Sequence, residues 1–477
     1  MRQKMILRLT AGLLPAIALG ACSMAPKYMA PAPPVPASWP VGDTYSAQSE
    51  AALPQVSYTE IFRDPRLQAL VQQALVNNRD IRTAAANVAA ARAQIRVVRS
   101  NQFPAVDVTA SETRMDRGGG AVAFGNLWTS QVQAGVSSFE LDLFGKLANA
   151  TAAQRDRALS TEAAARTVRL GLVADLALAW ATYAADKDLL AIAESTVANA
   201  QDSVRLTEAR LKGGIAPRSD VSQARQILET ANGDVAAQKT ALAQDVNAIR
   251  LLVGAEFDRA LLPEGIQQVN DGLAALPAGT SSNVLLRRPD VVSAEYDLRA
   301  ANADIGVARA ELFPSISLTG LLGFASDSLS SLFDSASFSN TLGADASWSI
   351  FNAGGRSANV NVAKAQRDAA LATYEKAIQT AFREVSDALA DQGTLAERLR
   401  AAKANTDAAQ DTARLTEATY KQGIASSLDN LDAQRSLYTA RRSEVAVRLQ
   451  AAANRITLYR VLGGDQATPA EGTAAQE

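Results

Sequence analysis

Residues able to carry out acid–base or nucleophilic chemistry are few in this 477-residue chain. It contains no histidine and one cysteine, which excludes imidazole as a general base or metal ligand and excludes a disulfide within the chain. Gly145-Lys146 is only a fragment of a phosphate-binding loop. Asp429 and Asp432 are spaced i, i+3 and therefore share one face of a helix. A hydrolase that uses carboxylates alone stays open, but no acidic pair lies in a recognisable pocket motif. We therefore expect no enzyme and no cofactor other than a covalent lipid.

The single cysteine, Cys22, follows a segment with the features of a secretory signal. Basic residues near the N-terminus precede an apolar run at 9–19, which is too short to span a bilayer comfortably. The sequence LGAC at 19–22 resembles a bacterial lipobox, in which cleavage precedes the cysteine and the thiol is acylated, for example by palmitate. The alternative is an incidental cysteine beside an ordinary cleavage site. Because Ser23 follows, rather than aspartate, we expect retention in the outer membrane.

The bulk composition is that of a folded protein, with 48% hydrophobic and 20% charged residues. A formal net charge of −2 leaves no basic stripe that could neutralise phosphates. We therefore expect no nucleic-acid partner.

Most of the chain is a tandem duplication. Three landmarks recur in the same order at nearly one offset: LTEA at 206–209 and 415–418, GIA at 214–216 and 423–425, and Phe-Pro at 103–104 and 313–314. Such a long period duplicates a whole structural unit, not a solenoid repeat. The predicted organisation is a signal peptide at 1–21, a lipidated extended segment at 22–60, a first repeat at 61–254, an inter-repeat equatorial segment at 255–286, a second repeat at 287–464 and a flexible tail at 465–477. Prolines at 26–40 indicate a strap laid along other elements, or a linker.

Each repeat has the same predicted order of elements. A first helix, at 64–102 or 289–312, ends at Phe-Pro because proline cannot continue a helix. After a pair of strands come helices at 146–212 and 356–421 without any proline, each roughly 100 Å long at 1.5 Å per residue. Each then turns at a glycine-containing segment and returns as a second helix, which predicts long helical hairpins of coiled-coil type.

Four segments alternate apolar and polar residues with the period of a strand, at 106–111, 128–144, 315–324 and 341–350. The alternation slips at Ser137-Ser138, where we expect a β-bulge. One apolar and one polar face is typical of a transmembrane barrel with a wet lumen, but also of a soluble sandwich. Four strands cannot close a barrel, and an open edge is forbidden in hydrocarbon. Either the strands are soluble, or several chains share one barrel, and three chains would supply twelve strands.

A specific resemblance comes from seven motifs: DPRL at 64–67, LDLFGK at 141–146, LLRRPD at 285–290, AE at 294–295, IGVARA at 305–310, FPSISLTG at 313–320 and FNAGGR at 351–356. With these motifs the chain resembles the outer-membrane factor family of tripartite efflux pumps (TolC/OprM-like), in its NodT-type lipoprotein branch, over essentially the whole mature chain. The resemblance implies a mixed α and β membrane protein. It would be a homotrimer whose twelve-stranded transmembrane β-barrel, four strands per chain, lies on a long α-helical coiled-coil periplasmic tunnel.

The resemblance also implies partners and a location. The partners would be a periplasmic adaptor (membrane fusion) protein and an inner-membrane pump, usually of the resistance-nodulation-division type. The chain would be lipid-anchored through Cys22, would span the outer membrane, in contact with its lipid, and would extend into the periplasm.

Two functional patches can be carried over from the family. The hairpin turns would be adaptor-docking tips, formed by Gly213, Gly214, Ile215, Ala216, Gln422, Gly423, Ile424 and Ala425. Glycine in a turn also simply permits a positive φ, and only the first tip carries a proline, Pro217. Asp429 and Asp432 would form an aspartate ring at the closed periplasmic gate. The alternative is that Asp429 caps the returning helix while Asp432 is solvated.

We therefore expect an outer-membrane exit duct that passively conducts drugs or other small toxic solutes. The alternative is a duct for type I protein secretion, which uses the same architecture, and a third interpretation is a structural coiled-coil lipoprotein. The substrate cannot be read from the sequence, because an exit duct passes what its pump delivers.

Overall fold

The computed structural model describes residues 23–42, 44–45, 57–115, 127–274 and 281–464. The predicted signal peptide, Cys22, residues 116–126 and the predicted tail at 465–477 lie outside these residues. The chain divides into two compact units. The sheet unit comprises residues 1–32, 86–162 and 293–375, and the hairpin unit comprises residues 33–85, 163–292 and 376–477. Each unit combines segments of both predicted repeats, so the repeats are not separate domains in space.

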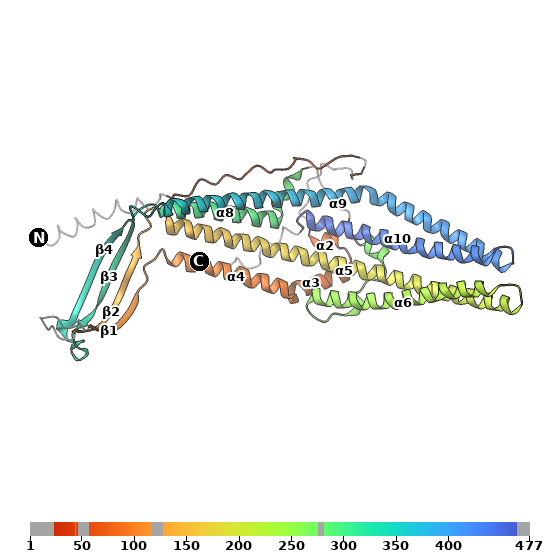
Figure 1. The fold of residues 1–477 in the computed structure, drawn as a ribbon, viewed down its shortest axis with the longest axis horizontal. Coiled ribbons are helices and arrows are strands. Elements are labelled where there is room, and N and C mark those ends of the chain that lie inside the picture. Colours follow the sequence, from red (N-terminus) through yellow and green to blue (C-terminus); the bar gives the residue numbers. More distant parts are fainter. Residues whose placement is uncertain (1–22, 43, 46–56, 116–126, 275–280, 465–477) are drawn as a thin grey trace. The chain divides into compact units, whose positions relative to one another are not determined.

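Helices account for most of the described residues (Figure 1). The α-helices are α2 (Tyr58–Ile61), α3 (Pro65–Asn77), α4 (Arg79–Ser100), α5 (Lys146–Lys212), α6 (Arg218–Val253), α7 (Ile266–Asp271), α8 (Pro289–Ala310), α9 (Gly355–Lys421) and α10 (Ser427–Val461). The short 3-10 helices are η2 (Arg259–Leu261), η3 (Ser282–Arg287), η4 (Leu329–Ser331) and η5 (Ser335–Ser337). The two longest helices, α5 and α9, have 67 residues each, as the proline-free runs predicted.

The single helix predicted at 64–102 is wrong, because Asn78 separates α3 from α4. Asn78 has an extended backbone, and its side-chain Oδ1 accepts hydrogen bonds from the amides of Asp80 (2.8 Å) and Ile81 (3.1 Å). Its amide Nδ2 donates to the carbonyl of Leu252 at 2.8 Å. Asparagine is among the best residues for starting a helix, since its side chain satisfies otherwise unpaired amides. The hydrophobic periodicity continues through this position and hides the break.

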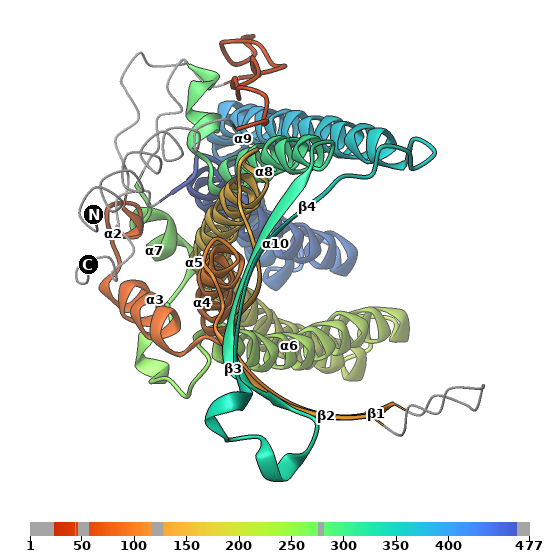
Figure 2. The ribbon, with the colours of Figure 1, turned by 90° about the vertical axis from the view of Figure 1, so that its left-hand side faces the viewer.

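The sheet unit contains one antiparallel sheet in the order β1-β2-β3-β4 (Figure 1), and Figure 2 shows the same sheet nearly edge-on. Its strands are β1 (Asp107–Met115), β2 (Leu127–Glu140), β3 (Ser315–Ser326) and β4 (Phe338–Ser347). The register between β2 and β3 shifts between Val136 and Phe139, which confirms the predicted bulge. The fourth strand begins earlier than predicted, because Phe338 pairs with Phe324 on β3. It also ends earlier, because Trp348 leaves the ladder and its indole donates to the carbonyl of Leu312 at 3.1 Å.

The register aligns most alternating residues of the four strands into one mainly apolar and one mainly polar face; the polar exceptions on the apolar face include Glu112, Arg114, Ser130 and Asn340. On the apolar face Val108 pairs with Ala134, Ala134 with Leu322, and Leu318 with Ala344. On the polar face Ser111 pairs with Gln131. Leu322 and Leu342 of the apolar face are 59% and 89% exposed. The sheet therefore presents a broad apolar surface that the described part of this chain does not cover.

The proline-containing strap lies along α8 in the sheet unit. The side chain of Asn302 donates to the carbonyl of Pro26 at 2.7 Å, and Arg309 donates to the carbonyl of Met24 at 3.1 Å. A Cβ on Gly306 would lie 2.7 Å from the amide nitrogen of Ala25, so only glycine leaves room for the strap. The prediction of a strap, and not a linker, holds for residues 23–32.

Arg288, in the LLRRPD motif, holds several segments of the hairpin unit together. Its side chain is only 7% exposed, and it donates to Asp290 (2.8 Å), Glu384 (2.8 Å) and the carbonyl of Val461 (2.9 Å). These contacts join the start of α8 to α9 and to the last residue of α10. A buried guanidinium needs such partners, because an unpaired buried charge is strongly unfavourable. We therefore attribute Arg288 and Asp290 of this motif to the stability of the fold.

Candidate docking tips and gate

The two helical hairpins of the hairpin unit, α5–α6 and α9–α10, end in turns of the same construction (Figure 1). Gly214 and Gly423 have φ of +74° and +79°, a left-handed conformation that favours glycine. The next residues, Ile215 and Ile424, donate back to the carbonyls of Arg210 (3.0 Å) and Thr419 (2.9 Å). This is the Schellman pattern, which satisfies the last carbonyls of α5 and α9.

Each tip exposes a branched apolar side chain to solvent. Ile215 is 77% exposed and Ile424 is 74% exposed. Leu428, which follows the second tip, is 53% exposed. Isoleucine at the outermost point of a turn contributes nothing to this chain's own core. The predicted docking residues are thus brought together as two rigid turns that each present an apolar group.

The returning helices begin differently. At the second tip Ser426 and Asp429 form a capping box, in which the hydroxyl of Ser426 accepts from the Asp429 amide at 3.1 Å and the Asp429 carboxylate accepts from the Ser426 amide at 3.2 Å. At the first tip Pro217 occupies the N-cap without any side-chain hydrogen bond. The two tips therefore share their turn but not their helix start.

Asp429 and Asp432 both lie on the exposed side of α10. Asp429 does cap the helix, and Asp432 pairs with Arg435 at 3.1 Å across an exposed surface. Their neighbours Asn430 and Leu431 are each 2% exposed and face the core. The helix thus turns both carboxylates away from its own packed side. Capping by Asp429 is compatible with the gate assignment, which stays a prediction.

Close to the tips the two hairpins interlock through residues that the sequence did not single out. The guanidinium of Arg210 lies over the ring of Tyr420, 4.1 Å from its centre, and donates to the Tyr420 carbonyl. The hydroxyl of Thr207 lies 3.4 Å from that of Tyr420. A tyrosine and an arginine on separate helices give no motif, so only the fold reveals the contact.

A second link joins the hairpins farther from the tips. Tyr438 on α10 donates its hydroxyl to Asp234 on α6, and Arg442 lies 3.6 Å from the same carboxylate. Burial, followed by the hydrogen bond to Asp234, raises the pKa of Tyr438 to about 12, so its hydroxyl stays protonated. Any movement that separates α6 from α10 must break this link.

Within the first hairpin, Asp186 on α5 and Asp245 on α6 form a carboxyl pair. The Oδ2 atom of Asp245 is buried, and no donor within the described residues reaches it. Burial, and then the charge of Asp186, raises the pKa of Asp245 to about 7. Two carboxyls in contact are satisfied only when they share a proton.

Comparison with known proteins decides the family. The profile described as "Outer membrane efflux protein" matches residues 70–255 and 280–464. The chain belongs to this family. The antibiotic efflux pump outer membrane protein ArpC of Pseudomonas putida is 42% identical over 454 residues, covering 94% of each chain. The toluene efflux pump outer membrane protein TtgC, also of Pseudomonas putida, has the same identity and coverage.

A solved structure agrees with these relatives. The crystal structure of CusC superimposes with a TM-score of 0.83 at 36% identity and covers 93% of this chain and all of that one. CusC is the cation efflux system protein of Escherichia coli. These comparisons confirm the prediction of an outer-membrane efflux channel, and they do not support the secretion alternative. The roles of the tips, the gate residues and Cys22 stay predictions.

Proposed function

We propose that three copies of this chain close a twelve-stranded barrel in the outer membrane and form the exit duct of a tripartite efflux system. The sheet carries the proposal. Its strands have 9 to 14 residues, close to the roughly 9–11 that cross a bilayer as a tilted strand. Its apolar face is exposed and its opposite face is polar, as in barrels with lipid outside and water inside.

The two ends of the sheet support the same placement. Aromatic residues gather at each end of the strands, as at the two interfaces of a transmembrane barrel. One group lies at the helical end and comprises Phe103, Phe144, Phe313 and Trp348; the other lies at the far end and comprises Trp128, Phe324, Phe333 and Phe338. Phe333 and Trp348 are 70% and 55% exposed.

The edges of the sheet require further copies. Among the described residues, strands β1 and β4 each pair on one side only. Unpaired backbone amides and carbonyls are not tolerated in hydrocarbon, so β1 of one copy must pair with β4 of the next. Three copies give twelve strands, which is enough to close a barrel with a lumen.

The helices then supply the periplasmic part of the duct. We assign the exposed tips at Gly214 and Gly423 to adaptor docking, and Asp429 and Asp432 to the gate, where six carboxylates from three chains would favour cations. Acylation of Cys22 would add a lipid anchor to the barrel. The partners would be a periplasmic adaptor and an inner-membrane pump, of resistance-nodulation-division type, which supplies the energy.

The substrate class is small toxic solutes. The names of the relatives cover antibiotics, toluene and cations at comparable identity. We infer that the choice of cargo lies mostly in the pump, because similarly related ducts serve systems named for different substrates.

Cross-linking tests the architecture directly. Ser111 on β1 and Thr341 on β4 lie on the same face of the sheet. Ser111→Cys is combined in turn with Ser339→Cys, Thr341→Cys or Gly343→Cys, three positions on the same face of β4, and oxidised in outer membranes. At least one pair should give covalent dimers and trimers and nothing larger. A variant with Thr341→Cys alone is the matched control and should give no trimer. The absence of covalent trimers from every pair, or products larger than three chains, contradicts the proposal.

Conductance in planar bilayers tests the gate separately. Asp429→Ala combined with Asp432→Ala should conduct more than the parent chain, because the ring of carboxylates is lost. If the double variant conducts no more than the parent, the gate assignment fails while the barrel stands.

A further inference from the structure

The hairpin unit contains a pocket of about 440 Å³ that the duct does not require. Helices α5, α7, α9 and α10 form it, together with Gly265 at the start of α7. Its polar lining includes Asp188, Thr406, Arg441 and the Glu444–Arg448 pair, and its apolar lining includes Ile192 and Val445. The volume falls in the range of small-molecule sites in proteins, about 300–1,000 Å³. Because α5 belongs to one hairpin and α9 and α10 to the other, an occupant would touch both.

One lining group has an unmet hydrogen bond. The hydroxyl of Thr406 is buried and finds no partner among the described residues, and the residue is only 7% exposed. Buried hydroxyls are nearly always paired, because leaving one unpaired costs about 1–3 kcal/mol. Thr406 differs from other threonines of α9, such as Thr412, whose hydroxyl bonds to the carbonyl four residues earlier. A ligand in the pocket would satisfy it.

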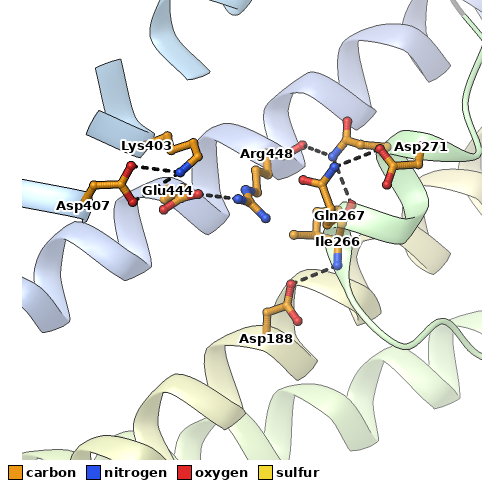
Figure 3. A network of polar contacts seen from close by, with 9 residues as sticks. Asp188, Ile266, Gln267, Asp271, Lys403, Asp407, Glu444 and Arg448 are labelled. Atoms are coloured by element: carbon orange, nitrogen blue, oxygen red, sulfur yellow. Dashed lines mark hydrogen bonds and ion pairs between the residues drawn. The ribbon is translucent and has the colours of Figure 1, made fainter. Parts of the chain in front are cut away.

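The acidic side of the pocket is Asp188 (Figure 3). Its Oδ2 accepts from the Ile266 amide at 2.9 Å, and it forms no ion pair with any described residue. Burial is the main influence on its pKa and raises it, against the opposing effects of the Ile266 hydrogen bond, Arg448 and Lys187. Such a carboxylate has a free oxygen in a partly desolvated place, where an ammonium group would be favoured.

The basic side is on α10. Arg448 is already paired with the carboxylate of Glu444, which is 12% exposed, and Lys403 beyond it pairs with Asp407 at 2.9 Å (Figure 3). Arg441 differs, since its Nη2 donates to the amide oxygen of Gln410 at 3.3 Å, and no carboxylate among the described residues pairs with it. Arg441 therefore keeps donors for an anionic group.

We propose that the pocket binds a small zwitterion of amino-acid type. Its ammonium group lies on Asp188, and its carboxylate lies on Arg441 and the Thr406 hydroxyl. Its side chain lies against the apolar walls formed by Ile192 and Val445. A plain anion meets the carboxylate of Asp188, and a plain cation meets the guanidinium of Arg441, while Arg448 and Glu444 neutralise each other, so a ligand with both charges matches the lining. The binding does not depend on transport.

Calorimetry on the full chain in detergent micelles, with L-leucine as the probe, tests the proposal. N-acetyl-L-leucine lacks the ammonium group and L-leucinamide lacks the carboxylate. L-leucine should bind saturably and about tenfold tighter than either analogue, since a hydrogen bond to a charged group contributes about one factor of ten or more. Equal binding of either analogue, or no saturable binding of L-leucine, overturns the proposal.

Three variants test which side chain of the pocket binds the ammonium group and which bind the carboxylate group of L-leucine. Asp188→Asn should remove the preference for L-leucine over the acetylated analogue, and Arg441→Gln should remove the preference over the amide. Thr406→Val keeps the shape and buried volume, so it should weaken L-leucine without unfolding the chain. Arg400→Gln, on the exposed surface of α9, is the matched arginine control and should bind L-leucine like the parent. If Thr406→Val and Arg441→Gln both bind L-leucine like the parent, the ligand does not lie where we place it.

Discussion

The carboxyl pair of the first hairpin makes the stability of the helical part dependent on pH. Replacing Asp245 by asparagine removes the ionisable group but keeps its size and gives Asp186 a permanent hydrogen-bond donor. In the parent chain, burial and the charge of Asp186 raise the pKa of Asp245 from 3.8 to about 7. The folded chain therefore holds a proton that the unfolded chain has released.

The sign follows from that difference in bound protons. Between about pH 4 and pH 7 the folded state binds one more proton than the unfolded state, so the free energy of unfolding falls as pH rises. The full shift of about three pH units would correspond to roughly 4 kcal/mol at 1.36 kcal/mol per unit. Because Asp245 and Asp186 are only half-buried, solvent screening reduces this to about 1–2 kcal/mol. Above about pH 7 the free energy of unfolding has lost this whole contribution, and below about pH 4 it has lost none of it.

Thermal unfolding of the detergent-solubilised chain, followed by circular dichroism at about 222 nm, measures the effect. Asp245→Asn should be more stable than the parent at pH 8, by about 1–2 kcal/mol, and nearly equal at pH 4. Asp175→Asn, which changes an exposed carboxylate on α5, should show no such pH-dependent gain. If Asp245→Asn is less stable than the parent at pH 8, or shifts equally at both pH values, the shared proton is refuted.

Three further substitutions test other parts of the structure. Arg288→Ala removes the buried guanidinium that bonds Asp290, Glu384 and the Val461 carbonyl and leaves two carboxylates that are 38% and 35% exposed. It should destabilise the chain by about 1.5–3 kcal/mol, the contribution of hydrogen bonds to a charged group, measured by the same unfolding experiment; a loss below about 0.5 kcal/mol would show that Arg288 does not hold these segments together. Gly306→Val should displace the strap at Ala25 and make it sensitive to protease, and unchanged protection would contradict the close contact. Ser426→Ala removes the capping box and should cost about 1 kcal/mol, seen as faster amide hydrogen exchange in the first turn of α10 only; unchanged exchange there would mean that the cap does not hold the helix.

Much of the fold could be predicted from periodicity, because long helices and amphipathic strands each have a single repeating pattern. The proline-free run at 146–212 became α5 with the predicted bounds. The slip at Ser137-Ser138 became a register shift. The predicted strand ends were less accurate: β4 begins at Phe338, three residues before the predicted segment at 341–350, because Phe338 pairs with Phe324 on β3. Such pairing depends on a partner strand that the local sequence does not contain.

The candidate site was likewise predictable only in part: local turns could be read from the sequence, and contacts between distant segments could not. The two hairpin turns could be predicted because a glycine follows each long proline-free run in the sequence, and both glycines have positive φ; their role in docking stays a prediction. Contacts between helices could not, since Arg210 with Tyr420 and Asp234 with Tyr438 are set by packing across separations of 210 and 204 residues. The pocket at Thr406 has no sequence signal at all. Its residues come from four helices, and only their placement shows that one hydroxyl is left without a partner among the described residues.

The central claim is that this chain is the outer exit of an efflux system for small toxic solutes. The most direct measurement is the susceptibility of a strain that lacks only this chain to a panel of antibiotics, organic solvents and metal cations. Loss of the chain should sensitise the cell to at least one of these classes, and the parent gene on a plasmid should restore resistance. Unchanged susceptibility together with the loss of a secreted protein, or with envelope fragility alone, would contradict this function.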